Sequence, residues 1–156
     1  MLARIMAERI TILGADDDAD DRLLINDAFE ENELRNPIHW VADGEELMDY
    51  LYRRGKYEDL VGQPLPGLIL LDLNMPKKDG RAALKEIKED SNLHRIPVVI
   101  LTTSKADEDI LHTYGLGGSS FITKPVTFER LCEVVSVIST YWADIVSLPP
   151  ECRAVD

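Results

Sequence analysis

Residues 68–80 read LILLDLNMPKKDG, an apolar run followed at once by a carboxylate. The run Leu68–Leu71 does not alternate between apolar and polar residues. Strands of a parallel sheet have this pattern when helices cover both of their faces. The stretch therefore predicts a buried parallel strand that ends at Asp72.

Similar apolar runs recur along the chain at the spacing of a strand plus a crossover helix. The runs start 28, 30, 30 and 23 residues apart, at Ile10–Leu13, Ile38–Val41, Leu68–Leu71, Val98–Leu101 and Phe121–Ile122. Parallel strands need a connection of about this length, usually a helix. The sequence therefore predicts an α/β fold, a doubly wound (βα)5 parallel sheet, in which ligands bind beyond the carboxyl ends of the strands.

Polar residues at the start of the intervening segments indicate where the helices begin. Caps are expected from side chains that precede helical apolar spacing, namely Asp18, Asp43 with Glu46, Ser104 with Asp107, and Thr127. Residues 15–21, ADDDADD, hold five carboxylates. Of these, Asp20 and Asp21 are expected to favour the positive N-terminus of the first helix.

Acidic, hydroxyl and basic side chains stand directly after four of the five predicted strands. They are Asp16 and Asp17, Asp72, Thr102 and Thr103, and Lys124. Each alone is weak evidence, because an aspartate after a strand is common turn chemistry. The ends of parallel strands meet at one edge of the sheet, so these groups are expected to share one pocket.

The acidic members of this set suit a divalent cation. Mg²⁺ prefers octahedral oxygen ligands and is typically held by one or two carboxylates plus phosphate oxygens. Asp16 and Asp17 supply the anionic ligands, and Asp72 is expected to be both ligand and nucleophile. The backbone carbonyl of Asn74 can turn toward the same ion. A bound cation would also reverse the repulsion among the aspartates.

The other members suit a phosphoryl group. Lys124 is a compact cation that can hold one phosphoryl oxygen. Thr102 can donate its hydroxyl to another, and Thr103 is a further phosphoryl-binding candidate. The combined set predicts phosphoryl transfer onto a carboxylate.

At these residues the sequence closely resembles the receiver domain of two-component response regulators, from roughly residue 10 to residue 142. The motifs are the acidic pair Asp16-Asp17, LLDLNMPKKDG around Asp72, VVILTTS around Thr102 and FITKP around Lys124. The resemblance implies a flavodoxin-like sheet of order 2-1-3-4-5. It implies that Asp72 accepts a phosphoryl group from a histidine kinase. It also implies Mg²⁺ or Mn²⁺ on Asp17, Asp72 and the Asn74 carbonyl, with Asp16 assisting, in a signalling protein rather than an enzyme.

The resemblance also implies a switch made by Thr102 and Phe121. When a phosphoryl oxygen attracts the Thr102 hydroxyl, space opens and the aromatic ring turns inward. The surface formed by the fourth helix, the fifth strand and the fifth helix would then change shape.

Within this family the chain looks like the small regulators paired with cyanobacterial phytochromes. The shared features are the long segment Arg53–Gly67, the sequence KKDGR, Thr-Thr-Ser after the fourth strand, and an extended last helix containing Trp142. A phytochrome is therefore the expected kinase. One departure is that Gly14 and Ala15 stand where the family usually carries bulkier aliphatic residues.

The composition fits one domain and excludes several classes of partner. The chain has 156 residues and a formal net charge of −12, which argues against a general nucleic-acid binder. Two cysteines without metal-ligand spacing favour a reducing cytosol. We find no signal peptide or membrane span, so a cytoplasmic protein is expected. The expected organisation is an N-terminal extension (1–9), the receiver domain with its extended last helix (10–146) and a C-terminal tail (147–156).

No further domain is expected after the last helix, so the output is expected to travel through protein contacts. The partners would be the kinase, a downstream phosphotransfer protein or a second copy of the chain. The last helix has more apolar residues than one core needs, which suggests an interface. We predict a two-fold homodimer through Val137, Tyr141, Trp142, Ile145 and Val146.

Two other functions compete with this interpretation. One is a receiver-like scaffold that binds proteins without being phosphorylated. The other is a hydrolase of the haloacid dehalogenase class, which also forms an aspartyl phosphate. Such hydrolases carry an acidic residue two positions after the nucleophile, as general acid. Here that position is Asn74, which cannot supply a proton.

Overall fold

A computed structural model describes residues 10–32, 38–145 and 147–152, with only the backbone for 143–145, and its strands form a five-stranded parallel sheet. The strands are β1 (Ile12–Ala15), β2 (Ile38–Val41), β3 (Leu68–Leu71), β4 (Val98–Thr102) and β5 (Ser120–Thr123). Their order is β2-β1-β3-β4-β5. The predicted doubly wound fold and strand order are confirmed.

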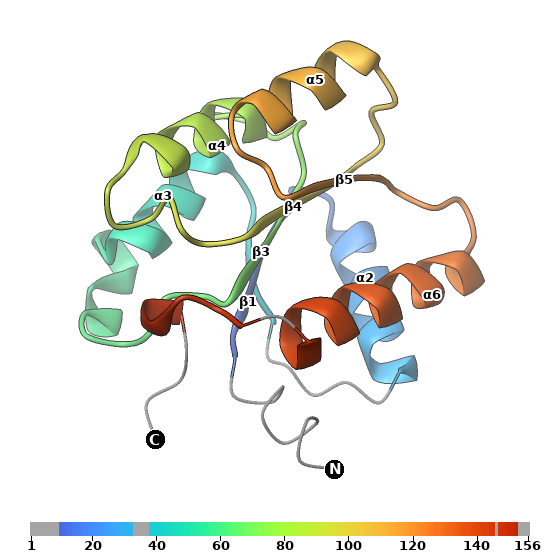
Figure 1. Cartoon of the computed structure of the whole chain (residues 1–156), viewed down its shortest axis with the longest axis horizontal. Coiled ribbons are helices and arrows are strands. Elements are labelled where there is room, and N and C mark those ends of the chain that lie inside the picture. Colours follow the sequence, from blue (N-terminus) through green and yellow to red (C-terminus); the bar gives the residue numbers. More distant parts are fainter. Residues whose placement is uncertain (1–9, 33–37, 146, 153–156) are drawn as a thin grey trace.

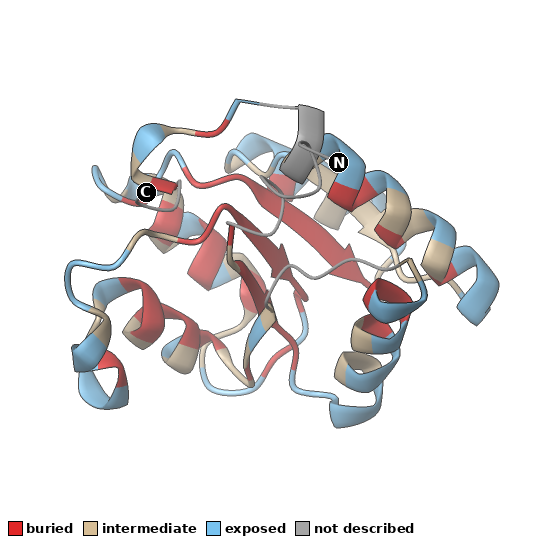
Figure 2. Ribbon diagram, turned by 90° about the horizontal axis from the view of Figure 1, so that it is seen from below, coloured by how far each residue is buried: buried red, intermediate tan, exposed pale blue. Residues whose placement is uncertain are grey.

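Helices cover both faces of the sheet (Figures 1 and 2). They are α2 (Ala19–Glu31), α3 (Gly44–Tyr52), α4 (Gly80–Glu89), α5 (Asp107–Gly115) and α6 (Phe128–Ser139). Shorter elements are the 3₁₀ helices η1 (Gly55–Leu60) and η3 (Pro150–Cys152), and η2 (Thr140–Ile145), a π-helical continuation of α6. Among the described residues, no helix is long and apolar enough to span a bilayer.

Two apolar clusters, one on each face, explain why the strands do not alternate in sequence. Leu68 and Leu70 of β3 contribute to the cluster beneath α2 and α6. Ile69 and Leu71 contribute to the cluster beneath α3 and α4. Burying one such side chain contributes roughly 1.5–3 kcal/mol. Successive residues of β3 therefore stabilise opposite layers of the molecule.

The predicted first strand, Ile10–Leu13, is shifted by two residues: β1 begins at Ile12, where its pairing with β2 and β3 starts, and that pairing continues through Gly14 and Ala15. Gly14 lies opposite Trp40 of β2. A Cβ atom at Gly14 would stand 2.3 Å from the Trp40 ring. The indole of Trp40 therefore occupies the space that a bulkier aliphatic side chain at position 14 would take. Packing beside Gly14 is thus provided by the neighbouring strand β2.

Three of the four predicted helix caps are confirmed. Asp18 accepts hydrogen bonds from the amides of the first turn of α2, Asp43 accepts from Glu46, and Thr127 accepts from Arg130. The cap predicted at Ser104 is wrong. The helix α5 begins after Ala106 without a side-chain cap. The hydroxyl of Ser104 instead donates to the carboxylate of Asp109 at 2.6 Å, because the loop places it beside that side chain.

The long segment before β3 is fastened to α3. The Tyr57 hydroxyl, on a buried ring, donates to Glu46 Oε2 at 2.6 Å, and Lys56 Nζ lies 2.8 Å from the same carboxylate. Burial alone would raise the pKa of Glu46. Hydrogen bonds from Lys56, Tyr57 and the Ala42 amide outweigh it and lower this pKa to about 2. An ionised Glu46 therefore holds the segment in place.

Residues 147–152 lie against the body of the molecule, which the sequence did not predict for a tail. Leu148 and Cys152 are buried in the cluster beneath α3 and α4. The Leu65 amide donates to the Glu151 carbonyl at 3.0 Å, and Arg95 pairs with the Glu151 side chain. This segment therefore belongs to the folded core.

Candidate metal centre at the strand ends

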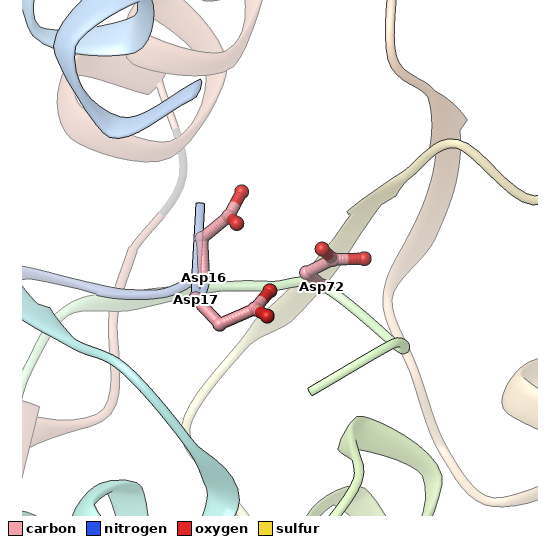
Figure 3. Close-up of side chains that lie close together, drawn as sticks. All are labelled: Asp16, Asp17 and Asp72. Carbon is pink, nitrogen blue, oxygen red and sulfur yellow. The ribbon is translucent and has the colours of Figure 1, made fainter. Parts of the chain in front are cut away.

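Three aspartates meet where β1 and β3 end. Asp16, Asp17 and Asp72 each offer a carboxylate oxygen, and these oxygens lie within 4.8 Å of one another (Figure 3). The strands β1 and β3 are paired up to Ala15 and Leu71, so their next residues emerge side by side. Asp16 and Asp72 are only 2% and 7% exposed, whereas Asp17 is exposed.

Lys124 balances this negative charge from the end of β5. Its Nζ atom lies 2.7 Å from Asp16 Oδ2, 2.8 Å from Asp21 Oδ2 and 3.3 Å from Asp72 Oδ2. Burial alone would lower the pKa of Lys124, but the hydrogen bonds to Asp16 and Asp21 outweigh it and raise the pKa. The buried ammonium therefore stays charged and holds the carboxylates of Asp16, Asp21 and Asp72 together.

Asp21 is a member of the site that the sequence analysis missed. It was expected only to favour the N-terminus of the first helix, which it also does. The cap at Asp18 starts α2 so that one residue of its first turn faces the strand ends. The signal in the sequence was its position three residues after a cap, but which first-turn residue faces inward depends on how the helix lies on the sheet.

The buried Asp72 carboxylate is also bound from the other side. The hydroxyl of Thr102, a fully buried residue, donates to Asp72 Oδ1 at 2.8 Å. The backbone amide of Asn74 donates to the same oxygen at 3.3 Å. One oxygen of Asp72 thus faces Thr102 and Asn74, and the other faces Lys124.

The loop after β3 is held by two close approaches to glycines. A Cβ atom at Gly80 would lie 2.2 Å from the Asp72 carbonyl oxygen, and one at Gly44 would lie 2.0 Å from the Lys78 carbonyl oxygen. The Gly44 amide donates to that Lys78 oxygen at 2.9 Å. These contacts require glycine and set the path of the chain on both sides of Asn74.

The remaining predicted switch residues lie further from the carboxylates. Thr103 is exposed just beyond β4. Phe121 is half-buried against the cluster beneath α3 and α4, and its amide donates to the Tyr114 hydroxyl at 3.2 Å. The roles predicted for Thr103 and Phe121 stay predictions.

The predicted dimer residues divide between surface and core. Val137 and Tyr141 are 68% and 48% exposed. Trp142 is half-buried and packs against both core clusters of its own chain. The side chain of Ile145 and the whole of Val146 lie outside the described residues.

The donors at the strand ends fit a hard divalent cation. Three carboxylates within ligand distance, two of them shielded from water, are the oxygen donors that Mg²⁺ or Mn²⁺ prefers. Burial, which outweighs the hydrogen bond from Lys124, raises the pKa of Asp16. A second positive charge at the cluster would therefore find carboxylates that one ammonium only partly balances.

The chain belongs to the family of response regulator receiver domains, whose model matches residues 12–136. Members of this family are signalling proteins rather than classical enzymes.

Its relatives include a cyanobacterial phytochrome response regulator. Response regulator Rcp1 of Synechocystis sp. is 38% identical over 141 residues, which are 90% of this chain and 93% of that protein. The phosphorylated cyanobacterial phytochrome response regulator RcpA is 40% identical and superposes with a TM-score of 0.83, covering 90% of this chain and 99% of that one. The Mn²⁺-bound form of Rcp1 is 38% identical, with a TM-score of 0.81 over 90% of this chain and 99% of that one. The predicted resemblance to phytochrome response regulators is confirmed.

Proposed function

We propose that this response regulator accepts a phosphoryl group on Asp72 from a histidine kinase of the phytochrome type. The observation that carries the proposal is the set of groups on this one carboxylate. Thr102 donates to one of its oxygens, Lys124 lies 3.3 Å from the other, and two further aspartates lie within ligand distance.

The transfer uses groups that are already in place. A carboxylate oxygen of Asp72 forms the new P–O bond as the P–N bond of the donor phosphohistidine breaks, and the imidazole leaves with the electron pair. Lys124 can then hold one phosphoryl oxygen and Thr102 can donate to another. All of these groups belong to this chain, so we expect a small acyl phosphate to replace the kinase.

Asp16, Asp17, Asp72 and the Asn74 carbonyl would hold the Mg²⁺ or Mn²⁺ ion. When bound, the ion neutralises negative charge on the phosphoryl oxygens. The similarity of this chain in sequence and fold to the Mn²⁺-bound form of Rcp1 supports this choice of metal.

The direct test is incubation with a small acyl-phosphate donor, with and without Mg²⁺, followed by intact mass measurement. We expect one phosphoryl group per chain with the metal, and far less after chelation. If no phosphoryl group is added under either condition, the result would favour the scaffold alternative. Turnover of many phosphoesters would favour the hydrolase, although Asn74 lacks the acid that such enzymes use.

The signal would leave through the surface of α5, β5 and α6, as Thr102 moves toward the phosphoryl group and Phe121 follows. The unit that performs this is proposed to span residues 10–146, with residues 1–9 as an extension and residues 147–156 as a C-terminal tail, of which residues 147–152 pack against the unit. We place the reaction in the cytoplasm, where the free Cys132 and Cys152 would remain reduced. A downstream phosphotransfer protein would receive the output.

The proposed homodimer rests on the exposed apolar side chains of α6 and its continuation. Val137→Glu is expected to shift the chain from dimer to monomer in equilibrium sedimentation, because a charge would be buried at the interface. Leu111→Glu changes an apolar residue on α5 that is at least as exposed, and it should leave the dimer intact. A monomer at high micromolar concentration in the unmodified chain would contradict the dimer.

A further inference from the structure

The helix α5 has little apolar attachment to the rest of the molecule. Thr113 is its one fully buried residue, and the helix starts without a side-chain cap. Most of its other side chains point into water. Its position must therefore depend on a small number of polar contacts, and the strongest of these is with α4.

Arg81 and Asp109 join α4 to the first turn of α5. Arg81 Nε and Nη2 donate to the two oxygens of Asp109, each at 2.8 Å. Both side chains are partly shielded, at 28% and 19% exposure. A bidentate, charge-assisted pair of this kind fixes direction as well as distance. Hydrogen bonds from Arg81 and Ser104 lower the pKa of Asp109 to about 2, so the pair is ionised at neutral pH.

Ser104 ties the same carboxylate to the strand that carries Thr102. Its hydroxyl donates to Asp109 at 2.6 Å, and its amide lies 3.5 Å from the Thr102 hydroxyl oxygen. Its carbonyl accepts from Thr123 of β5 at 3.4 Å. A continuous set of contacts thus runs from Asp72 through Thr102, Ser104 and Asp109 to Arg81.

We propose that Arg81, Asp109 and Ser104 form a latch that holds α5 and residues 103–106 in the unphosphorylated position. Release of this latch is the step by which movement of Thr102 reaches the output surface. In this role Arg81 is a positioning residue, because it acts on Thr102 through Asp109 and Ser104. The link to phosphorylation rests on the proposed function, whereas the hold on α5 does not.

The latch predicts a specific effect on equilibrium. Contacts made only in the unphosphorylated position favour that position, and the phosphoryl group must offset them to shift the population. Removing them moves α5 toward its released position in advance. Because part of the population is then already released, phosphorylation has less of it left to shift.

The test is hydrogen exchange measured by mass spectrometry on the full chain, following the amides of residues 109–112. Without phosphorylation, Arg81→Gln and Asp109→Asn should each raise exchange there about tenfold, because two charge-assisted hydrogen bonds are lost. The double variant should exchange no faster than either single variant, since both remove one interaction. Arg130→Gln breaks the exposed Arg130–Glu133 pair of α6 and should leave this segment unchanged.

The second readout separates a latch from a purely structural pair. After treatment with the acyl phosphate and Mg²⁺, hydrogen exchange of residues 109–112 should rise in the chain without substitutions. It should rise much less in the Arg81→Gln and Asp109→Asn variants. A full phosphorylation-dependent rise in the variants, or wild-type exchange before treatment, overturns the latch. If the chain without substitutions is not phosphorylated, the result counts against the proposed function. The comparison of hydrogen exchange between the untreated chains still tests the hold on α5. Unchanged exchange in β1 and β3 verifies that the variants are folded.

Discussion

Asp72→Asn is expected to take up no phosphoryl group from a small acyl-phosphate donor in the presence of Mg²⁺. The amide removes the nucleophilic oxygen and one anionic metal ligand, yet it has nearly the same shape. Its carbonyl oxygen can still accept the Thr102 hydroxyl, so the fold should be kept. Intact mass measurement over a time course, with circular dichroism to verify folding, reads out the result.

The matched control is Asp59→Asn, which changes an exposed aspartate of η1 that lies away from the strand ends. This variant should be phosphorylated at the rate of the unmodified chain. Persistent single phosphorylation of Asp72→Asn would assign the acceptor to another residue, and Asp16 and Asp17 would be the next to replace.

Lys124→Met should destabilise the chain by about 3 kcal/mol when no divalent metal is present, because it leaves buried carboxylates unpaired. The ammonium contacts three carboxylates, and Asp16 among them is almost fully buried. Methionine keeps the apolar stem and removes only the charge. Urea denaturation at neutral pH, which gives the free energy of unfolding, measures the loss.

The pH dependence of this loss follows from the direction of the Lys124 pKa. The pKa is raised on folding. The stabilisation that the charged Lys124 gives the fold is therefore fully present below the pKa of an unfolded lysine, about 10.4. It is lost as the pH rises through the higher pKa of Lys124 in the folded chain. The difference between variant and parent should thus be constant from pH 6 to about pH 9.

Metal and control measurements complete the Lys124 test. Mg²⁺ should stabilise the variant more than the parent, since the ion then replaces the positive charge that Lys124 supplied beside the carboxylates of Asp16 and Asp72. Lys85→Met, on the exposed face of α4, should change stability by less than about 0.5 kcal/mol. A Lys124 variant as stable as this control would show that the three carboxylates need no internal cation.

Much of the fold could be predicted because the apolar runs are local signals. The run Leu68–Leu71 and the run Ile38–Val41 form strands with the predicted bounds. The predicted start of β1 is two residues too early, because Ile10 is apolar for a different reason: it packs in the core just before the strand begins. The cap predicted at Ser104 is wrong for a related reason, since a serine before a helix can also donate its hydroxyl to a carboxylate of the first turn, here Asp109.

The sequence by itself determined the strands, their parallel arrangement and the convergence of Asp16, Asp17 and Asp72 at one edge. These follow from periodicity and from the fact that parallel strands end on the same side. Only the tertiary structure decided that Asp21 reaches Lys124, that Trp40 covers Gly14 and that Arg81 grips Asp109. Each of these contacts depends on the rotation of a helix or on the register of neighbouring strands. Packing of the whole core sets both, and no short stretch of sequence encodes them.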